Sequence, residues 1–113
     1  MFTFPGLEAL RSQFASSLDT RISDIDRHRR AASTASSASE RCRALESACS
    51  VLHQIAGTAG VLGFDAVGQA ARACENALIA YLDGPDAASA TCPTVTLQDL
   101  ERFVFETWET LSR

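Results

Sequence analysis

The side chain best suited to chemistry in this 113-residue sequence is His53. A neutral imidazole is a nucleophile near pH 7, and a helix fixes the direction in which it points. At about 100° per residue, His53 lies roughly 80° from the centre of an apolar helical stripe near Leu52 and Ala56. That position is the edge of the solvent-facing side, which it shares with Glu46, Ser50, Gly57 and Gly60.

Two glycines so close together in one helix need an explanation, because each is about 1 kcal/mol less favourable than alanine. One interpretation is that a large partner must approach the His53 imidazole closely, so that side chains are excluded around it. The other is that Gly57 and Gly60 let a neighbouring helix pack tightly and that His53 is an ordinary half-exposed residue. The spacing alone leaves both open.

The other reactive side chains in the sequence give weaker indications of a chemical function. His28 lies within an Arg-His-Arg-Arg stretch, residues 27–30, which suits the negative end of a helix dipole. Neither histidine can be combined with a Ser/His/Asp grouping, a glycine-rich phosphate loop or paired metal ligands, which disfavours a hydrolase or a metalloenzyme. The cysteines have no C-x-x-C pair or zinc spacing, and we interpret them as reduced thiols of a cytoplasmic protein: Cys42, Cys49, Cys74 and Cys92.

Four segments repeat apolar residues with a helical period, and none alternates as a strand would. The first helix is expected to have Pro5 in its first turn and an apolar stripe from Leu7 to Ile25, and residues 31–39 form a hinge whose alanines could extend either neighbour. A capping box of Ser37 and Glu40 opens the second helix, which stops at Gly63. Its expected buried residues are Leu45, Cys49, Leu52, Ala56 and Ala59.

The third helix is expected to be capped by Asp65 and to end at Asp83-Gly84-Pro85, and a second capping box, of Thr96 and Asp99, opens the fourth. The expected apolar faces are Val67, Ala71, Cys74, Leu78 and Tyr81, and then Leu97, Leu100, Phe103, Val104, Trp108 and Leu111. Four amphipathic helices with a tight turn between the middle two predict an all-α fold, an antiparallel four-helix bundle.

The composition agrees with one soluble domain spanning residues 1–113, since 46% of residues are hydrophobic, 21% are charged and the mean hydropathy is +0.00. Ten arginines against fourteen acids give a net charge of −4, which argues against nucleic acid as a partner. No secretory signal and no apolar run of membrane-spanning length is found. We therefore expect a cytoplasmic protein that does not bind membranes.

Residues 52–78, LHQIAGTAGVLGFDAVGQAARACENAL, resemble the signature of histidine-containing phosphotransfer (HPt) domains. In that family a phospho-accepting histidine opens an H-x-L-K-G motif, which is followed by small residues, a glycine-bounded turn and an alanine-rich helix that carries a glutamate. The matching positions here are His53, Ile55, Gly57, Ala59, Gly63 and Glu75.

The resemblance implies an up-down four-helix bundle that carries a phosphoryl group on His53 between receiver domains of a multistep two-component phosphorelay. Its partners would be response regulator receiver domains, a hybrid histidine kinase, or both, and it would act as a monomer. The chain would be a phosphoryl carrier with no independent catalytic site and no cofactor, because the Mg²⁺ ion belongs to the receiver. The residues expected around His53 in binding are Gln54, Gly57, Gly60, Arg72 and Glu75.

One position departs from the family pattern, because Ala56 stands where the motif has a basic residue. If the second and third helices are antiparallel about residue 64, Arg72 lies opposite Ala56 and Glu75 opposite His53. Arg72 could then offer its guanidinium to the phosphoryl group, or it could be solvated and paired with Glu75 on its own helix. The departure keeps open a non-transferring adaptor that binds receiver or kinase domains and regulates by occupancy, and an unrelated helical interaction module is a third reading.

Overall fold

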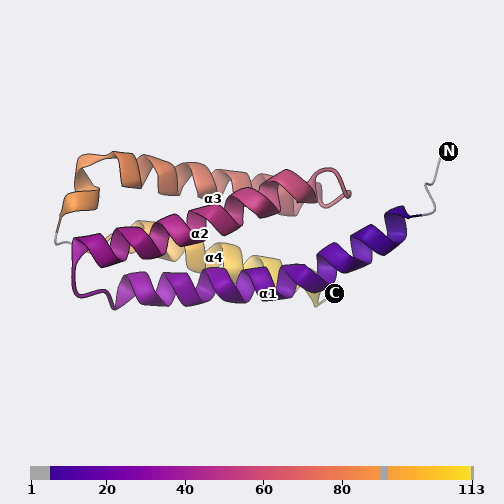
Figure 1. The fold of residues 1–113 in the computed structure, drawn as a ribbon, viewed down its shortest axis with the longest axis horizontal. Helices are drawn as coiled ribbons and strands as arrows, with labels where there is room; N and C mark the ends of the chain where they lie inside the picture. Colours follow the sequence, from indigo (N-terminus) through magenta and orange to yellow (C-terminus); the bar gives the residue numbers. More distant parts are fainter. Residues whose placement is uncertain (1–5, 90–91, 113) are drawn as a thin grey trace.

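The computed structural model describes residues 6–89 and 92–112. Within these ranges the chain forms helices and no strands: α1 Leu7–Ser33, α2 Ala38–Ala59, α3 Asp65–Asp83, the short 3₁₀ helix η1 Pro85–Ala88, and α4 Thr94–Leu111. Figure 1 shows the four long helices running antiparallel in chain order. Helix α1 packs against α2 and α4, and α3 packs against the same two helices, so the bundle closes into a ring. The predicted all-α four-helix bundle is confirmed.

The apolar stripes of all four helices meet in one core. Its largest fully buried side chains are Leu18, Ile22, Ile25, Leu45, Leu52, Ile55, Leu78 and Leu100. The expected stripe of α1 fails at its N-terminal end, where Leu10 is 53% exposed because this end of the helix projects past the other three (Figure 1). Cys49 and Tyr81, which were expected in the core, are only half-buried at its margin.

The predicted start of α2 is confirmed. The Ser37 hydroxyl accepts a hydrogen bond from the Glu40 backbone N–H at 3.1 Å. The Glu40 carboxylate accepts from the Ser36 backbone N–H at 3.0 Å, and this bond lowers the pKa of Glu40. The predicted hinge is shorter than expected, because α1 continues to Ser33 and buries Ala32 against the core.

The two other predicted caps are wrong. Asp65 is the first residue of α3, not its cap, because Phe64 occupies the N-cap position and its ring packs on Phe14 at 5.3 Å between centroids. Helix α4 begins at Thr94, directly after Pro93, so Thr96 lies inside the helix. The carboxylate of Asp99 is bonded to Arg102. The expected role of Pro5 lies outside the described residues.

Helix α2 ends at Ala59, four residues before the predicted stop, and the chain then turns through a Schellman motif around Gly63. Gly63 has φ 86°, a left-handed conformation that glycine adopts without strain. The Phe64 N–H bonds the Ala59 carbonyl at 2.8 Å, and the Gly63 N–H bonds the Gly60 carbonyl at 3.3 Å, which is the bond pair of this motif. The chain reverses here, so α2 and α3 form an antiparallel hairpin.

Candidate functional site

His53 lies on the outer surface of the bundle, where α2 meets α3. Its side chain is 75% exposed, and its Nδ1 lies 2.7 Å from Oε2 of Glu75, whose side chain is only 10% exposed. A carboxylate can only accept, so the Nδ1–H of His53 donates this bond. In the neutral imidazole this bond leaves the lone pair on Nε2, on a ring that is largely in solvent. The bond also favours one orientation of the ring.

Two close contacts define how α2 and α3 are aligned. One is the His53–Glu75 hydrogen bond. The other is at Gly68, where an added Cβ would lie 3.3 Å from the Ala59 Cβ and 3.4 Å from the Gly60 nitrogen. Since the hairpin is antiparallel, the positions between these two contacts also face each other, which places Arg72 of α3 opposite Ala56 of α2.

The glycines beside His53 do not serve helix packing. A Cβ built on Gly57 or on Gly60 would meet nothing within 4 Å, so both leave bare backbone on the surface. The interpretation that these two glycines admit a neighbouring helix is therefore wrong. The glycine that admits a neighbouring helix is Gly68. The sequence analysis missed it, although in an antiparallel hairpin its position falls opposite the small residues Ala59 and Gly60. The open surface next to His53 fits the alternative, in which a partner approaches the imidazole.

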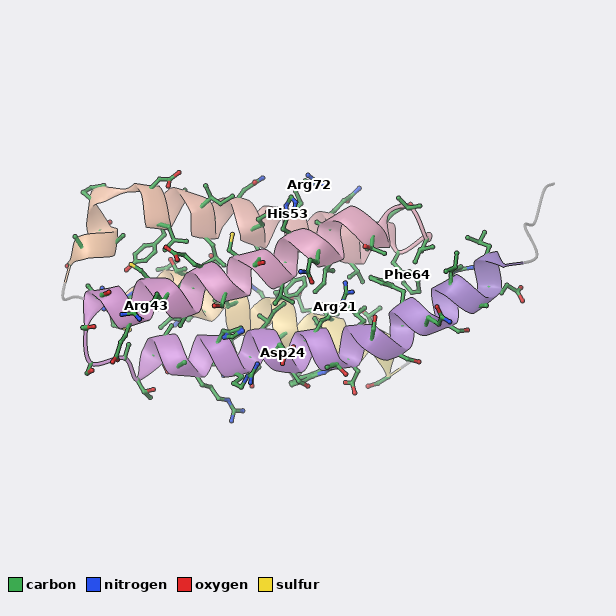
Figure 2. The ribbon with its side chains drawn as sticks, in the orientation of Figure 1. Arg21, Asp24, Arg43, His53, Phe64 and Arg72 are labelled. Atoms are coloured by element: carbon green, nitrogen blue, oxygen red, sulfur yellow. The ribbon has the colours of Figure 1, made fainter. Side chains whose placement is uncertain are left out.

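Arg72 is exposed and takes part in no hydrogen bond or ion pair within the described residues. The alternative in which it pairs with Glu75 on its own helix is not realised, because the Glu75 carboxylate bonds His53. Figure 2 shows Arg72 and His53 at the same edge of the bundle. Ala56, at the position where the motif has a basic residue, is 7% exposed and presents only a methyl group.

Among the expected binding residues, Gln54 lies on a different side of α2 from His53. It is exposed, but it lies about 100° further round α2 than His53. Its position is at the margin of any surface centred on the imidazole.

Two thiols lie near the site without being suited to chemistry. The Cys49 Sγ is 4.0 Å from the Glu75 carbonyl oxygen, and burial, with a smaller contribution from the Glu75 charge, raises the pKa of Cys49. Burial raises the pKa of Cys74 to about 12. Because the thiolate is the reactive form, both side chains behave as small apolar residues near neutral pH. All four cysteines are free.

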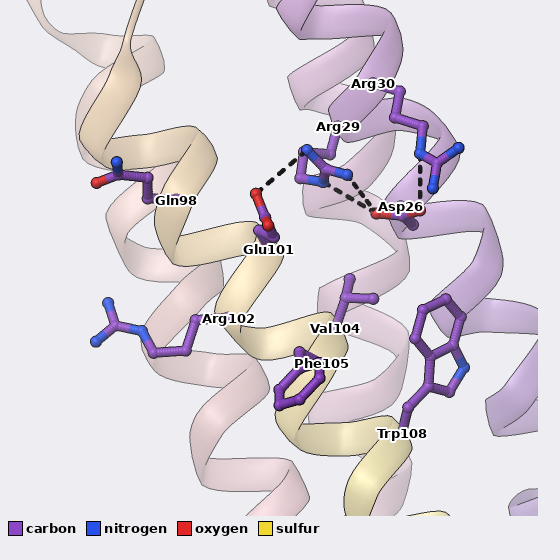
Figure 3. A pocket seen from close by; sticks show the side chains of 9 residues that line it. All are labelled: Asp26, Arg29, Arg30, Gln98, Glu101, Arg102, Val104, Phe105 and Trp108. Carbon is purple, nitrogen blue, oxygen red and sulfur yellow. Dashed lines mark hydrogen bonds and ion pairs between the residues drawn. The ribbon is translucent and has the colours of Figure 1, made fainter.

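A separate groove of about 600 Å³ runs along the junction of α1 and α4, on the other side of the ring from the α2–α3 junction (Figure 3). The buried carboxylate of Asp26 pairs with Arg29 at 2.8 Å and with Arg30 at 3.0 Å. Arg29 also reaches Glu101 of α4 at 3.6 Å. Of these ion pairs, only Arg29–Glu101 joins α1 to α4, since Asp26, Arg29 and Arg30 all belong to α1. His28 is half-buried on α1, and burial lowers its pKa.

Residues 6–89 and 92–112 contain neither a metal-binding cluster nor a membrane-spanning helix. No group of three or more histidine, cysteine, aspartate or glutamate side chains there could hold a metal ion. None of the helices in this part of the chain combines the length and the apolar character needed to cross a membrane.

The comparisons with known proteins agree with this geometry. The family model of the Hpt domain matches residues 9–104, a range that includes all of α2 and α3 and every residue of the site. No curated protein and no solved structure matches the chain. A family match over most of the chain, together with a four-helix bundle that exposes a histidine beside a glycine-lined surface, shows that this protein belongs to the Hpt domain family.

Proposed function

We propose that this protein carries a phosphoryl group on His53 between response regulator receiver domains of a cytoplasmic two-component phosphorelay. The observation that carries the proposal is the exposed imidazole whose Nδ1 is held at 2.7 Å by the buried carboxylate of Glu75. Membership of the Hpt family supports the class of reaction. A hybrid histidine kinase could serve as the partner too, because its receiver domain carries the same aspartyl phosphate.

The proposed transfer is a single displacement at phosphorus. Nε2 of His53 attacks the aspartyl phosphate of the receiver, a P–N bond forms, and the P–O bond to the aspartate breaks. The aspartate leaves as a carboxylate that keeps the electron pair of that bond. The imidazole becomes positively charged while its Nδ1–H stays bonded to Glu75, so that carboxylate stabilises the charge as it develops. The reverse reaction passes the group to the next receiver, and the receiver brings its own Mg²⁺ ion.

The surface around His53 suits this encounter. The reacting atoms must approach to about 3–3.5 Å, which leaves little room for obstruction. Gly57 follows His53 by one helical turn, and its Cα and that of Gly60 carry no side chain that would hold a receiver away. Catalysis in phosphoryl transfer is mainly positioning and charge stabilisation, so a carrier needs little more than an accessible, oriented nucleophile.

The test is transfer from a phosphorylated receiver domain, read as an acid-labile label on this protein. We expect His53→Gln to abolish labelling and to leave the melting temperature nearly unchanged, because the His53 side chain is 75% exposed. The matched control is His28→Gln, which should still be labelled because His28 lies on α1, away from the α2–α3 junction. Normal labelling of the His53 variant would overturn the proposal.

A second candidate is a non-transferring adaptor that binds receiver or kinase domains. The observation that favours it is Ala56, whose buried methyl group stands where the motif has a cation. The same experiment separates the two functions, since an adaptor binds the receiver and acquires no label on His53.

A further inference from the structure

We infer that Arg72 is the residue that contacts the transferred phosphoryl group beside His53. The inference rests on the proposed function. It assigns to Arg72 of α3 the positive charge that Ala56 of α2 does not provide. Arg72 would touch the reacting group itself, through hydrogen bonds from its guanidinium to phosphoryl oxygens.

The charge of the phosphorylated state favours such a cation. A phosphoryl group on Nε2 carries up to two negative charges, and the positive ring is already paired with Glu75 on its other side. A positive group near Nε2 would therefore stabilise the phosphorylated state. On α2 the nearest arginine is Arg43, ten residues from His53 and therefore about 15 Å along the helix at 1.5 Å per residue.

The alignment of α2 and α3 brings Arg72 to this place. It lies opposite Ala56, which is three residues, or about 4.5 Å along the helix, from His53. Arg72 is likewise three residues from Glu75, the bonded partner of His53. A long side chain rooted at this position can extend along the surface towards Nε2, and Figure 2 shows Arg72 and His53 at the same edge.

Nothing in the described residues holds Arg72 elsewhere. Its guanidinium has no hydrogen bond or ion pair there, whereas four other arginines are each paired with a carboxylate: Arg27, Arg29, Arg30 and Arg102. The surface it must cross is flat, because Ala56 is small and Gly57 has no side chain. A fork of N–H donors matches the oxygens of a phosphoryl group, and the charge of arginine persists at every working pH.

The experiment measures labelling of His53 with two donors, a phosphorylated receiver domain and the small molecule phosphoramidate. We expect Arg72→Ala to slow labelling by about tenfold with both donors, since a charge-assisted hydrogen bond is being removed. Arg72→Lys should keep part of the rate because it keeps the charge. In the Arg72→Ala background, Ala56→Lys should restore part of the rate from the other helix. Arg43→Ala is the matched control, an exposed arginine of the same bundle, and should be labelled like the unchanged protein.

The two donors separate the possible failures. If Arg72→Ala is labelled at the normal rate by both donors, the inference is wrong and the proposed function stands. If only the receiver reaction slows, Arg72 serves docking and does not contact the phosphoryl group, so the inference again fails. If the unchanged protein acquires no label on His53, the proposed function fails, and the inference fails with it. Circular dichroism of Arg72→Ala should match that of the unchanged protein, because the side chain is exposed.

Discussion

At the scale of single residues, the site consists of one exposed ring and one buried carboxylate on different helices. His53 alone would be a histidine that rotates freely and exchanges its proton between two nitrogens. The 2.7 Å contact with Glu75 restricts that freedom, because in the neutral ring a bond to the carboxylate places the hydrogen on Nδ1 and the lone pair on Nε2. We therefore expect the reactivity of His53 to depend on both residues of the pair.

Replacing Glu75 tests this directly. Glu75→Gln keeps the shape of the side chain and an oxygen that can accept the Nδ1 hydrogen bond, but it removes the negative charge. A bond to a charged group exceeds a neutral one by about 1 kcal/mol, so we expect labelling of His53 to slow by roughly fivefold. The melting temperature should not fall, because a neutral amide is no worse than a carboxylate at a position that is 10% exposed. The check is the labelling rate of the variant beside its thermal unfolding, and an unchanged rate would show that Glu75 does not contribute.

Much of this site was predictable from single residues. A helical projection places His53 at the edge of the wet face, and a turn near residue 64 is enough to set Glu75 opposite it. Gly68 needed more than single-residue reasoning, because its role depends on the alignment of α3 with the Ala59 side chain and the Gly60 backbone. The sequence also left open whether Arg72 pairs with Glu75. Only the structure shows that the Glu75 carboxylate bonds His53 instead.

At the scale of the elements, the α2–α3 hairpin separates two uses of glycine. Gly68 admits the backbone of α2, whereas Gly57 and Gly60 face open space. Adding a side chain at one of these glycines should therefore affect stability differently from adding one at another.

A pair of substitutions in this hairpin makes the difference measurable. Gly57→Gln should raise the free energy of unfolding by up to about 0.8 kcal/mol, because glutamine is a better helix former and its Cβ meets no neighbour. The same change should weaken receiver binding and transfer together, since a side chain now projects beside the imidazole. Gly68→Ala is the control, and there the gain in helix propensity should be lost or reversed, because the new Cβ lies 3.3 Å from that of Ala59. A destabilised Gly57→Gln with normal receiver affinity would contradict this account.

The boundaries of the elements show where local sequence patterns stop being sufficient. The capping box at Ser37 and Glu40 forms. It follows a polar linker, where no neighbouring residue offers an alternative helix start. The similar pattern at Thr96 and Asp99 does not, because Pro93 starts α4 earlier. Asp65 loses the cap position to Phe64, whose ring packs on α1 across the bundle. Tertiary packing decides such boundaries, and a capping motif records only a local preference.

At the scale of the whole molecule, the ring of four helices places two polar contacts on different junctions. His53 and Glu75 meet between α2 and α3, while Arg29 and Glu101 meet between α1 and α4. The periodicity of the sequence predicts which side of each helix is buried, and hence a four-helix bundle. It does not say which charged side chains meet across a junction, so the Arg29–Glu101 ion pair was not foreseen.

Separate surfaces should allow stability and transfer to change independently. Asp26→Ala leaves Arg29, whose side chain is 17% exposed, with only the more distant Glu101 as a partner. We expect it to lower the free energy of unfolding by about 1–3 kcal/mol, the effect of leaving a largely buried charged group poorly paired. The labelling rate of His53 should be normal at temperatures where the variant is folded. Denaturant unfolding and labelling of the same preparation check both, and a slower rate in the folded variant would mean that the two junctions are coupled.

The Gly63 turn also has a kinetic consequence. His53 and Glu75 are 22 residues apart in the chain, and the reversal between α2 and α3 takes only a few residues. The entropy lost in closing a loop grows with its length, so this short connection makes re-pairing of the two helices inexpensive and fast. When the hairpin opens locally, the imidazole and its carboxylate should find each other again without the chain ends having to rearrange. We therefore expect the His53–Glu75 contact to re-form on the timescale of a helical hairpin and not on that of the entire bundle.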